Sequence, residues 1–203
     1  FSCIAEKEFY DLDKFEQDMA QLSHIFNKQL NNHIVLFGGE PLLNPEINKF
    51  VEISRKNFPK VPIDIITNGI LLDDMDEKFW KTVSENKAEI LPSIYPIEIN
   101  WKSILDKAKK YNVGMYVYYK HKQKLTINNI DEFRKDHFRK TVLNINGYNH
   151  DTSKPKCDMQ DRCINMQNGK LYPCANIACI RHLNKKFGTK FKVTENDYLD
   201  LYK

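Results

Sequence analysis

Two glycines and a carboxylate, Gly38-Gly39-Glu40, follow a short apolar run over residues 33–37. Because glycine has no Cβ, a backbone with two glycines can lie close against a ligand. A carboxylate directly after them can accept charge-assisted hydrogen bonds from an ammonium group, and Pro41 fixes the turn that follows. The pattern indicates a binding site for a small ligand. The alternative is an ordinary tight turn with an exposed glutamate.

A second group of residues with metal-binding chemistry lies near the C-terminus. Four of the five cysteines fall close together, namely Cys157, Cys163, Cys174 and Cys179. An odd total and this clustering fit a metal site in a reducing compartment better than a disulfide framework. Four thiolates that are close in sequence can bind an iron–sulfur cluster or zinc. The alternative to both is a set of four unmodified thiols.

The segments that must position these residues alternate between strand and helix patterns. Short apolar runs predict strands at residues 33–37, 63–67, 89–94, 113–119 and 142–145. Apolar residues at helical spacing predict helices that begin at Asp11 and Pro45, and others at 77–85, 101–111 and 131–135. This order favours an α/β fold with a parallel sheet or barrel, whose ligands gather at the C-terminal strand ends. No strand pattern precedes residue 33, so we expect a first strand upstream of residue 1.

The composition is that of a globular protein. Its 203 residues are 41% hydrophobic and 12% aromatic, which is enough for a substantial core. The net charge of +4 comes from 31 basic and 27 acidic residues in interspersed order. We interpret the lysine-rich stretches at 107–110 and 121–124 as solvated helix and loop surface, and we expect no nucleic-acid partner.

The sequence shows no targeting signal. No apolar run approaches the roughly 18–20 residues of a membrane span, and the opening residues lack the basic start and apolar stretch of a signal peptide. The absence of an initiator methionine indicates a fragment or a trimmed chain. We therefore expect a cytoplasmic protein with no membrane partner.

The composition changes at about residue 147. Residues 147–155 are polar and rich in turn formers, which is typical of a linker. We therefore divide the chain into an α/β part, residues 1–147, and a small Cys-rich module, residues 148–203. Within the module, Gly169 predicts a hairpin turn from which Leu171 and Tyr172 lead a strand into Cys174.

The segment Gly38-Gly39-Glu40-Pro41-Leu42 closely resembles the GGEP motif of radical S-adenosylmethionine (SAM) enzymes. Thr67-Asn68-Gly69 resembles the TNG motif at the family's next strand end, and Ser93 stands at the end of the strand after that. The resemblance covers most of residues 1–147 and implies a partial (β/α) barrel of the radical SAM type, here without its first strand. It implies that Gly38, Gly39 and Glu40 meet the SAM amino group, that Pro41 belongs to the same cofactor-binding motif, and that Thr67, Asn68 and Ser93 line the SAM pocket.

One defining feature of that family departs from this sequence. The CxxxCxxC motif, which binds a [4Fe–4S] cluster through three thiolates and leaves one iron open for SAM, is absent. Cys3 is the only cysteine in the first 156 residues. Two interpretations remain open. Either Cys3 is the third cysteine of the motif and the first two lie upstream, or the whole motif lies upstream and Cys3 follows it.

The Cys-rich module resembles the SPASM or twitch extension of radical SAM enzymes, which holds auxiliary iron–sulfur clusters. The resemblance rests on the first cysteine, on the glycine five residues before the third, and on Tyr172-Pro173-Cys174. The fuller SPASM set continues with more cysteines, whereas none follows Cys179 here. The resemblance therefore implies at most one auxiliary cluster, with Cys157, Cys163, Cys174 and Cys179 as its ligands.

The resemblance implies an enzyme in which a reduced [4Fe–4S] cluster cleaves SAM to a 5′-deoxyadenosyl radical. That radical would take a hydrogen atom from a small-molecule or peptide substrate. It also implies an electron donor such as flavodoxin or ferredoxin. The chain as it stands would be inactive, because its cluster ligands are incomplete. Two rival hypotheses are an inactive relative with a structural zinc or iron–sulfur module, which acts as a scaffold, and a nucleic-acid-associated zinc protein.

Overall fold

The computed structural model describes residues 8–119, 121–136 and 164–203. The chain divides into two compact units, Asp11–Arg139 and Phe1–Tyr10 with Lys140–Lys203. Several sequence predictions lie outside the described residues, namely Cys3, Cys157, Cys163 and the strand at 142–145.

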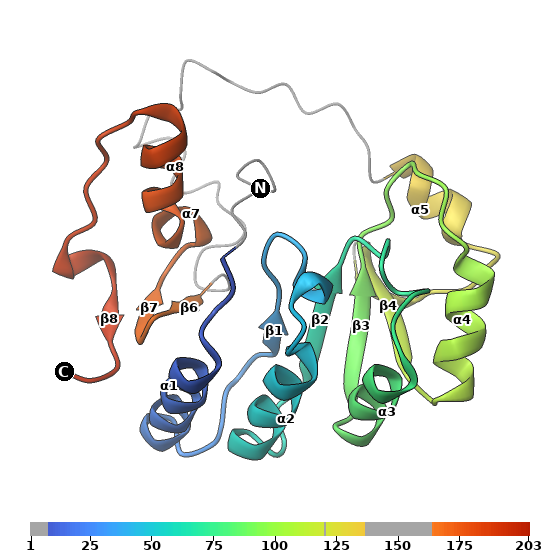
Figure 1. The fold of residues 1–203 in the computed structure, drawn as a ribbon, viewed down its shortest axis with the longest axis horizontal. Coiled ribbons are helices and arrows are strands. Elements are labelled where there is room, and N and C mark those ends of the chain that lie inside the picture. The colour runs from blue at the N-terminus through green and yellow to red at the C-terminus, as the bar shows by residue number, and fades with distance from the viewer. Residues whose placement is uncertain (1–7, 120, 137–163) are drawn as a thin grey trace. The chain divides into compact units, whose positions relative to one another are not determined.

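The larger unit is built on a five-stranded sheet with the strand order β1-β2-β3-β4-β5 (Figure 1). The first four strands are parallel to one another, and β5 is antiparallel to β4. The strands are β1 (Ile34–Leu36), β2 (Ile63–Thr67), β3 (Ala88–Pro92), β4 (Gly114–Tyr119) and β5 (His121–Lys124). The helices are α1 (Leu12–Ile25), α2 (Ile47–Asn57), α3 (Glu77–Glu85), α4 (Trp101–Lys110), α5 (Ile130–Asp136) and the short 3₁₀ helix η1 (Pro41–Leu43). Strands β1 to β4 thus alternate with helices, and the predicted α/β fold is confirmed.

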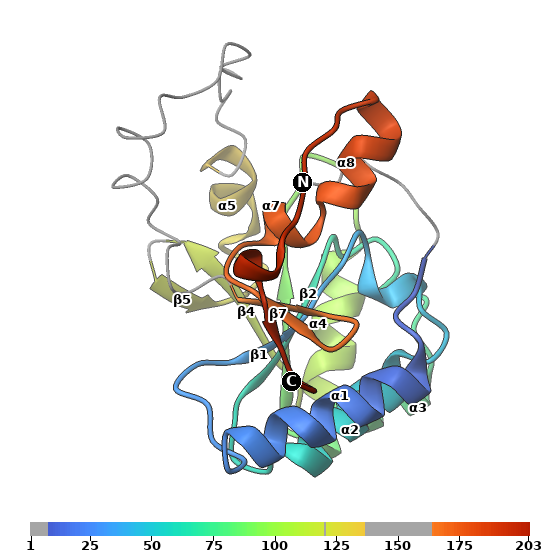
Figure 2. The same ribbon diagram turned by 90° about the vertical axis from the view of Figure 1, so that its left-hand side faces the viewer.

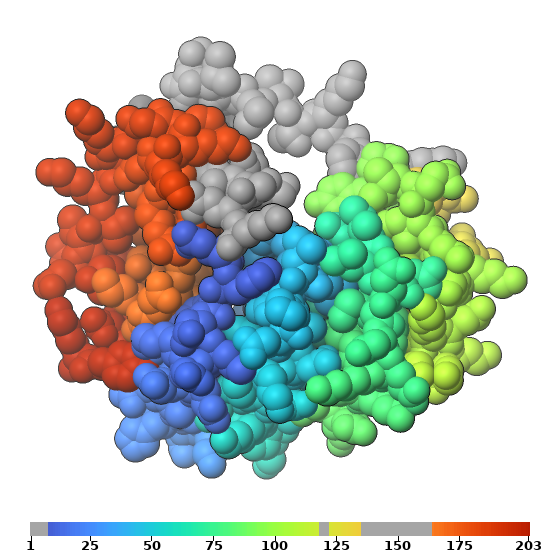
Figure 3. Space-filling model, in the orientation of Figure 1, coloured from blue at the N-terminus to red at the C-terminus, as the bar shows by residue number. Residues whose placement is uncertain are grey.

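The core of this unit lies between the sheet and the helices that cover one of its faces (Figures 1 and 2). Ile63 and Ile65 of β2 and Ile90 of β3 are fully buried, and so are Val51 of α2 and Phe79 of α3. Burying one such side chain stabilises the fold by about 1.5–3 kcal/mol. The outer faces of α2, α3 and α4 form the cyan-to-green surface of Figure 3.

Side-chain caps fix where the helices begin. Asp11 accepts a hydrogen bond from the backbone N–H of Lys14 at 2.8 Å, and Asp76 accepts one from Phe79 at the same distance. Asn100 caps α4 in the same way. Each cap satisfies a backbone donor that the helix cannot pair internally.

Among the described residues, no helix is both long enough and apolar enough to cross a membrane.

Strand β5 corrects the interpretation of residues 121–124 as solvated surface. Lys122 contacts two carboxylates, Asp64 at 3.5 Å and Glu89, and Asp64 is only 1% exposed. The Nδ1 atom of His33 lies 2.5 Å from the other oxygen of Asp64. Burial alone would lower the pKa of Lys122, but Glu89 and Asp64 together raise it above its ordinary value. The lysine therefore serves as a counter-ion for strands β2 and β3, and its own strand pairs with the edge of the sheet.

The smaller unit contains a three-stranded antiparallel sheet in the order β6-β7-β8. Its elements are β6 (Asn165–Gln167), β7 (Lys170–Tyr172), α7 (Ala175–Ala178), α8 (Ile180–Phe187), the 3₁₀ helix η3 (Glu195–Asp197) and β8 (Leu199–Asp200). The turn between β6 and β7 places Asn168 and Gly169 at φ values of 51° and 74°, which confirms the hairpin predicted at Gly169. Strand β8 and the two helices are elements that the sequence pattern does not predict.

Candidate functional site

The candidate site of the larger unit begins where β1 ends. Residues 38 and 39 form a bend, and Glu40 then caps the short helix η1. Its Oε1 atom accepts a hydrogen bond from the backbone N–H of Leu42 at 3.1 Å. Pro41 occupies the first position of η1, where its missing N–H and its fixed φ fit the start of a helix. Glu40 is thereby held at the C-terminal end of its strand.

The end of the neighbouring strand β2 holds the same carboxylate from the other side. The hydroxyl of Thr67 donates to Oε1 of Glu40 at 2.7 Å, and the backbone N–H of Asn68 donates to Oε2 at 2.8 Å. Both carboxylate oxygens are therefore fixed, and all three donors are neutral. Among the described residues, no cationic side chain contacts Glu40, so its negative charge remains uncompensated within that part of the protein. The exposed glutamate of an ordinary turn would show none of this organisation.

The Thr67-Asn68-Gly69 turn is itself rigidly built. Thr67 is 2% exposed, and its Oγ1 also accepts a hydrogen bond from the backbone N–H of Gly69 at 3.0 Å. Gly69 has a φ of +82°, and a Cβ added there would lie 2.7 Å from Cη2 of Trp101. Trp101 is almost fully buried at the start of α4. Gly69 is therefore required both by its backbone conformation and by the indole ring beneath it.

Gly38 and Gly39 contrast with Gly69. Neither has a positive φ, and a Cβ added at either position would meet no protein atom within 4 Å. The described fold therefore gives no conformational or packing reason for glycine at these two positions. The room in front of their backbone is open, which is the arrangement that close approach of a ligand requires.

Ser93 lies directly after β3 and ties this strand to the site. Its backbone N–H donates to the carbonyl oxygen of Thr67 at 2.8 Å, while its side chain is partly exposed. The predicted cofactor residues Gly38, Gly39, Glu40, Pro41, Thr67, Asn68 and Ser93 thus lie at the ends of three adjacent parallel strands. The structure brings them to one edge of the sheet, as parallel strands require.

Exposed apolar side chains stand directly beside the two motifs in the sequence, and sequence reasoning missed them. Phe37 and Ile70 are each 52% exposed, Leu43 is 60% exposed, and Ile66 of β2 is 36% exposed. Each stands beside a residue of the two motifs. A large apolar residue next to each polar motif is the signal that could have identified this rim. Such a rim can cover the less polar parts of a ligand whose charged end meets Glu40.

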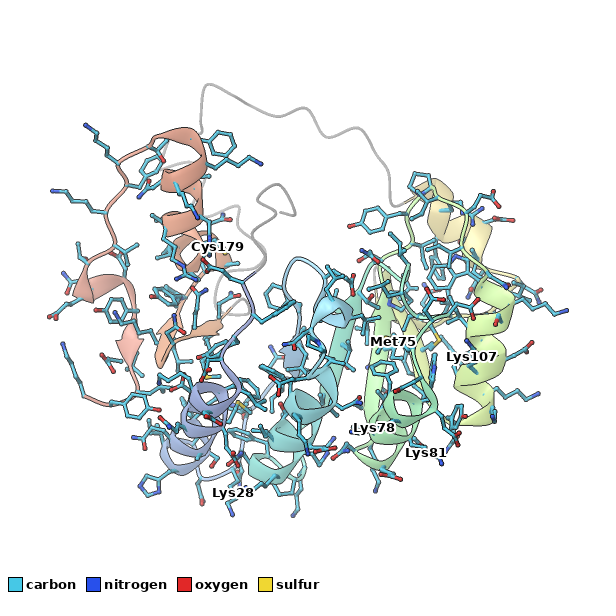
Figure 4. All side chains as sticks on the ribbon, in the orientation of Figure 1. Lys28, Met75, Lys78, Lys81, Lys107 and Cys179 are labelled. Atoms are coloured by element: carbon cyan, nitrogen blue, oxygen red, sulfur yellow. The ribbon has the colours of Figure 1, made fainter. Side chains whose placement is uncertain are left out.

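The smaller unit positions two of the four predicted metal ligands. Cys174 caps α7, and Cys179 lies between α7 and α8 (Figure 4). Desolvation by neighbouring atoms raises the pKa of the Cys179 thiol, whereas Arg181 opposes the rise and Cys174 adds to it. Among the described residues, no group of three or more His, Cys, Asp or Glu side chains could hold a metal ion. The other two predicted ligands, Cys157 and Cys163, lie outside those residues.

Comparison with solved structures finds similarity to two structures of the protein anSMEcpe. The native enzyme anSMEcpe with bound AdoMet and the Kp18Cys peptide is 21% identical, with a TM-score of 0.42 over 57% of this chain and 36% of that chain. A hexahistidine-tagged form of anSMEcpe with bound AdoMet is 24% identical, with a TM-score of 0.42 over 56% of this chain and 36% of that one. The match thus spans about a third of the length of those proteins. No curated protein matches this chain.

The family comparison is broader. The model of the radical SAM superfamily matches residues 5–159, which is more than half of the chain and includes the three strand ends described above. The chain therefore belongs to the radical SAM superfamily.

Proposed function

We propose that the site at the ends of β1, β2 and β3 binds SAM through its methionyl amino group. The observation that carries the proposal is the Glu40 carboxylate, which is held by three neutral donors and contacts no cation among the described residues. An ammonium group can donate hydrogen bonds to this carboxylate and supply the charge that it lacks. The residues present therefore fit the charged end of SAM.

Gly38 and Gly39 support the same proposal by what surrounds them. Their positions hold open room where a Cβ would stand, so a ligand can approach the backbone closely. Asn68 and Ser93 would line the same pocket. Thr67 would not line the pocket as the resemblance implies, because its buried hydroxyl already forms hydrogen bonds with Glu40 and with the N–H of Gly69. Its role would be to orient the carboxylate.

The proposed reaction is that of the superfamily. When bound, a reduced [4Fe–4S] cluster supplies the electron that cleaves SAM to methionine and a 5′-deoxyadenosyl radical able to take a hydrogen atom from a substrate. The cysteines among the described residues, Cys174 and Cys179, belong to the smaller unit, and Cys3 lies outside the described residues. The part that the larger unit contributes is to bind the amino end of SAM and to fix its orientation beside the strand ends.

The remaining components of the proposal follow the superfamily. The substrate would be a small molecule or a peptide, and a one-electron donor such as flavodoxin or ferredoxin would reduce the cluster. Cys157, Cys163, Cys174 and Cys179 would hold one auxiliary iron–sulfur cluster. The two cysteines of this set that the structure describes support the proposal in one respect, because Cys174 and Cys179 flank the same short helix.

The experiment is SAM cleavage by the full-length protein, reconstituted anaerobically with iron and sulfide and supplied with dithionite. We expect 5′-deoxyadenosine from the wild type and a large loss for Glu40→Ala. The matched control is Glu46→Ala, because Glu46 is an exposed carboxylate at the start of α2 that makes no capping hydrogen bond. Stoichiometric zinc without iron, and no cleavage, would instead favour the inactive scaffold.

A further inference from the structure

The surface of the smaller unit carries a segment in which basic and apolar residues alternate. Residues 185–193 read Lys-Lys-Phe-Gly-Thr-Lys-Phe-Lys-Val, and we refer to them as the basic–aromatic segment. Phe187 and Phe191 are 59% and 57% exposed, and Val193 is 38% exposed. The four lysines between and beside them are also exposed. Exposed aromatic side chains that cluster in this way mark interaction sites more often than isolated ones do.

The basic–aromatic segment is held in a defined shape. Helix α8 ends at Gly188, which adopts the left-handed conformation with φ of 63°. The side-chain amide of Asn184 donates to the carbonyl oxygen of Phe191 at 2.7 Å, and its oxygen accepts from the backbone N–H of Phe191 at 3.0 Å and from the hydroxyl of Thr189 at 2.7 Å. The chain after α8 is thereby fastened back onto the helix. Its exposed side chains are presented on a preorganised backbone, which lowers the entropy cost of binding.

Helix α8 lacks the burial that its sequence pattern calls for. Ile180, Leu183 and Phe187 recur at helical spacing, yet none of the residues of α8 is buried. An amphipathic helix of a folded protein normally packs its apolar side against something. Ile180 and Leu183 are only partly buried, and Phe187 is exposed.

The charges of the basic–aromatic segment indicate the kind of partner that it can bind. The nearest carboxylates in sequence are engaged elsewhere, since Glu195 pairs with Lys203 at 2.9 Å and Asp197 accepts from the backbone N–H of Thr194 at 2.7 Å. No described carboxylate forms an ion pair with Lys190 or Lys192. The segment therefore presents positive charge around an apolar centre, and its complement is a surface of carboxylates around apolar side chains.

We infer that the basic–aromatic segment is a docking surface for an acidic protein segment that carries apolar side chains between its carboxylates. Phe187 and Phe191 supply the anchors, and the lysines steer and orient the partner. A nucleic acid is disfavoured because the segment contains no arginine, the side chain best suited to phosphate, and the net charge of the chain is only +4. A lipid surface is disfavoured because Glu195, Asp197 and Asp200 follow closely in the same unit.

The test measures binding to the whole chain by fluorescence anisotropy, with a labelled peptide in which glutamates alternate with leucines. Three variants are compared with the wild type: Lys190→Glu with Lys192→Glu, Phe187→Ser with Phe191→Ser, and Lys28→Glu with Lys78→Glu. The last pair is the control, because Lys28 and Lys78 are exposed lysines of the larger unit and the change in net charge is the same (Figure 4). All six side chains are exposed, and circular dichroism checks that each variant folds.

We expect the peptide to bind the wild type in a salt-dependent manner. Either change in the basic–aromatic segment should weaken binding by about tenfold or more, whereas the control pair should leave it within about twofold. A loss in the Lys28→Glu with Lys78→Glu control equal to that in Lys190→Glu with Lys192→Glu would show a general charge effect and overturn the inference. Absence of binding, or tighter binding to oligothymidine or to phosphatidylserine vesicles than to the peptide, would also overturn it.

Discussion

The hydroxyl of Thr67 donates a hydrogen bond to Oε1 of Glu40 at 2.7 Å, and so joins the ends of two adjacent parallel strands. The same hydroxyl accepts from the N–H of Gly69. The two motifs that stand far apart in the sequence are therefore one structural unit. The carboxylate proposed to bind the cofactor derives its orientation from the second motif, and this relationship leads to the first two predictions.

Replacing Thr67 by valine should weaken both the site and the fold. The variant loses the donor to Glu40 and leaves the N–H of Gly69 without its acceptor, which costs about 1–3 kcal/mol for buried groups. We expect the affinity for SAM to fall about tenfold, as measured by equilibrium dialysis, and the urea midpoint to fall as well. Thr67→Ser keeps the hydroxyl and should restore most of the affinity. Equal affinities of the valine and serine variants for SAM would show that the Thr67 hydroxyl does not position Glu40.

Substitutions at two glycines should separate the ligand's requirements from those of the fold. Gly69→Ala forces a Cβ to 2.7 Å from Trp101 at a positive φ, and should lower the free energy of unfolding by about 1–3 kcal/mol. Gly38→Ala meets no protein atom, and should change stability by less than about 0.5 kcal/mol. Urea unfolding followed by tryptophan fluorescence measures both, because the two tryptophans lie in the larger unit.

The second half of that comparison is ligand binding. Gly38→Ala should lower the affinity for SAM by about tenfold although the fold is intact, because its methyl group would occupy room that the ligand needs. A variant that binds SAM as the wild type does would show that the open room beside Gly38 serves another purpose.

Removing Lys122 should destabilise the larger unit in a pH-dependent way. Lys122→Met leaves buried Asp64 with His33 as its remaining side-chain partner among the described residues, and we expect a loss of about 1–3 kcal/mol near neutral pH. The pKa of Lys122 is raised above 10.5 in the folded state, so its stabilising effect is complete below the pKa of the unfolded chain. It is lost as the pH rises through the folded value.

Urea unfolding of the wild type and of Lys122→Met, at about pH 8 and about pH 11, measures this effect. The difference between the two proteins should shrink at the higher pH. A difference that stays constant or grows would contradict the assignment of Lys122 as the counter-ion of Asp64 and Glu89. Lys124→Met, on the same strand and without an ion pair among the described residues, is the control.

Much of the larger unit could be predicted from periodicity. The helix at 77–85 has the predicted bounds, because Asp76 caps it and its buried residues recur at helical spacing. Strand β5 could not be predicted in this way, because His121-Lys122-Gln123-Lys124 contains no apolar alternation. It pairs with β4, and its Lys122 contacts carboxylates from strands far away in the sequence, which a local pattern does not contain.

The candidate site, too, could be predicted only in part from the sequence. The motifs at Gly38 and Thr67 could be placed near each other from sequence, since ends of adjacent parallel strands lie at one edge of a sheet. The atom that each side chain contacts could not be predicted from sequence. The resemblance places Thr67 in the pocket lining, but its hydroxyl contacts Glu40, and Trp101 beneath Gly69 carries no recognisable signal. Contacts of this kind depend on packing between segments, which a linear pattern does not contain.

We propose above all that the Glu40 carboxylate binds the ammonium group of SAM. The most direct test compares two ligands, SAM and methylthioadenosine, which lacks the amino-acid end, on the reconstituted full-length protein and its Glu40→Gln variant. We expect the variant to bind SAM at least about tenfold more weakly and to bind methylthioadenosine as the wild type does. Equal affinities of the two proteins for SAM, or equal losses for both ligands, would contradict it.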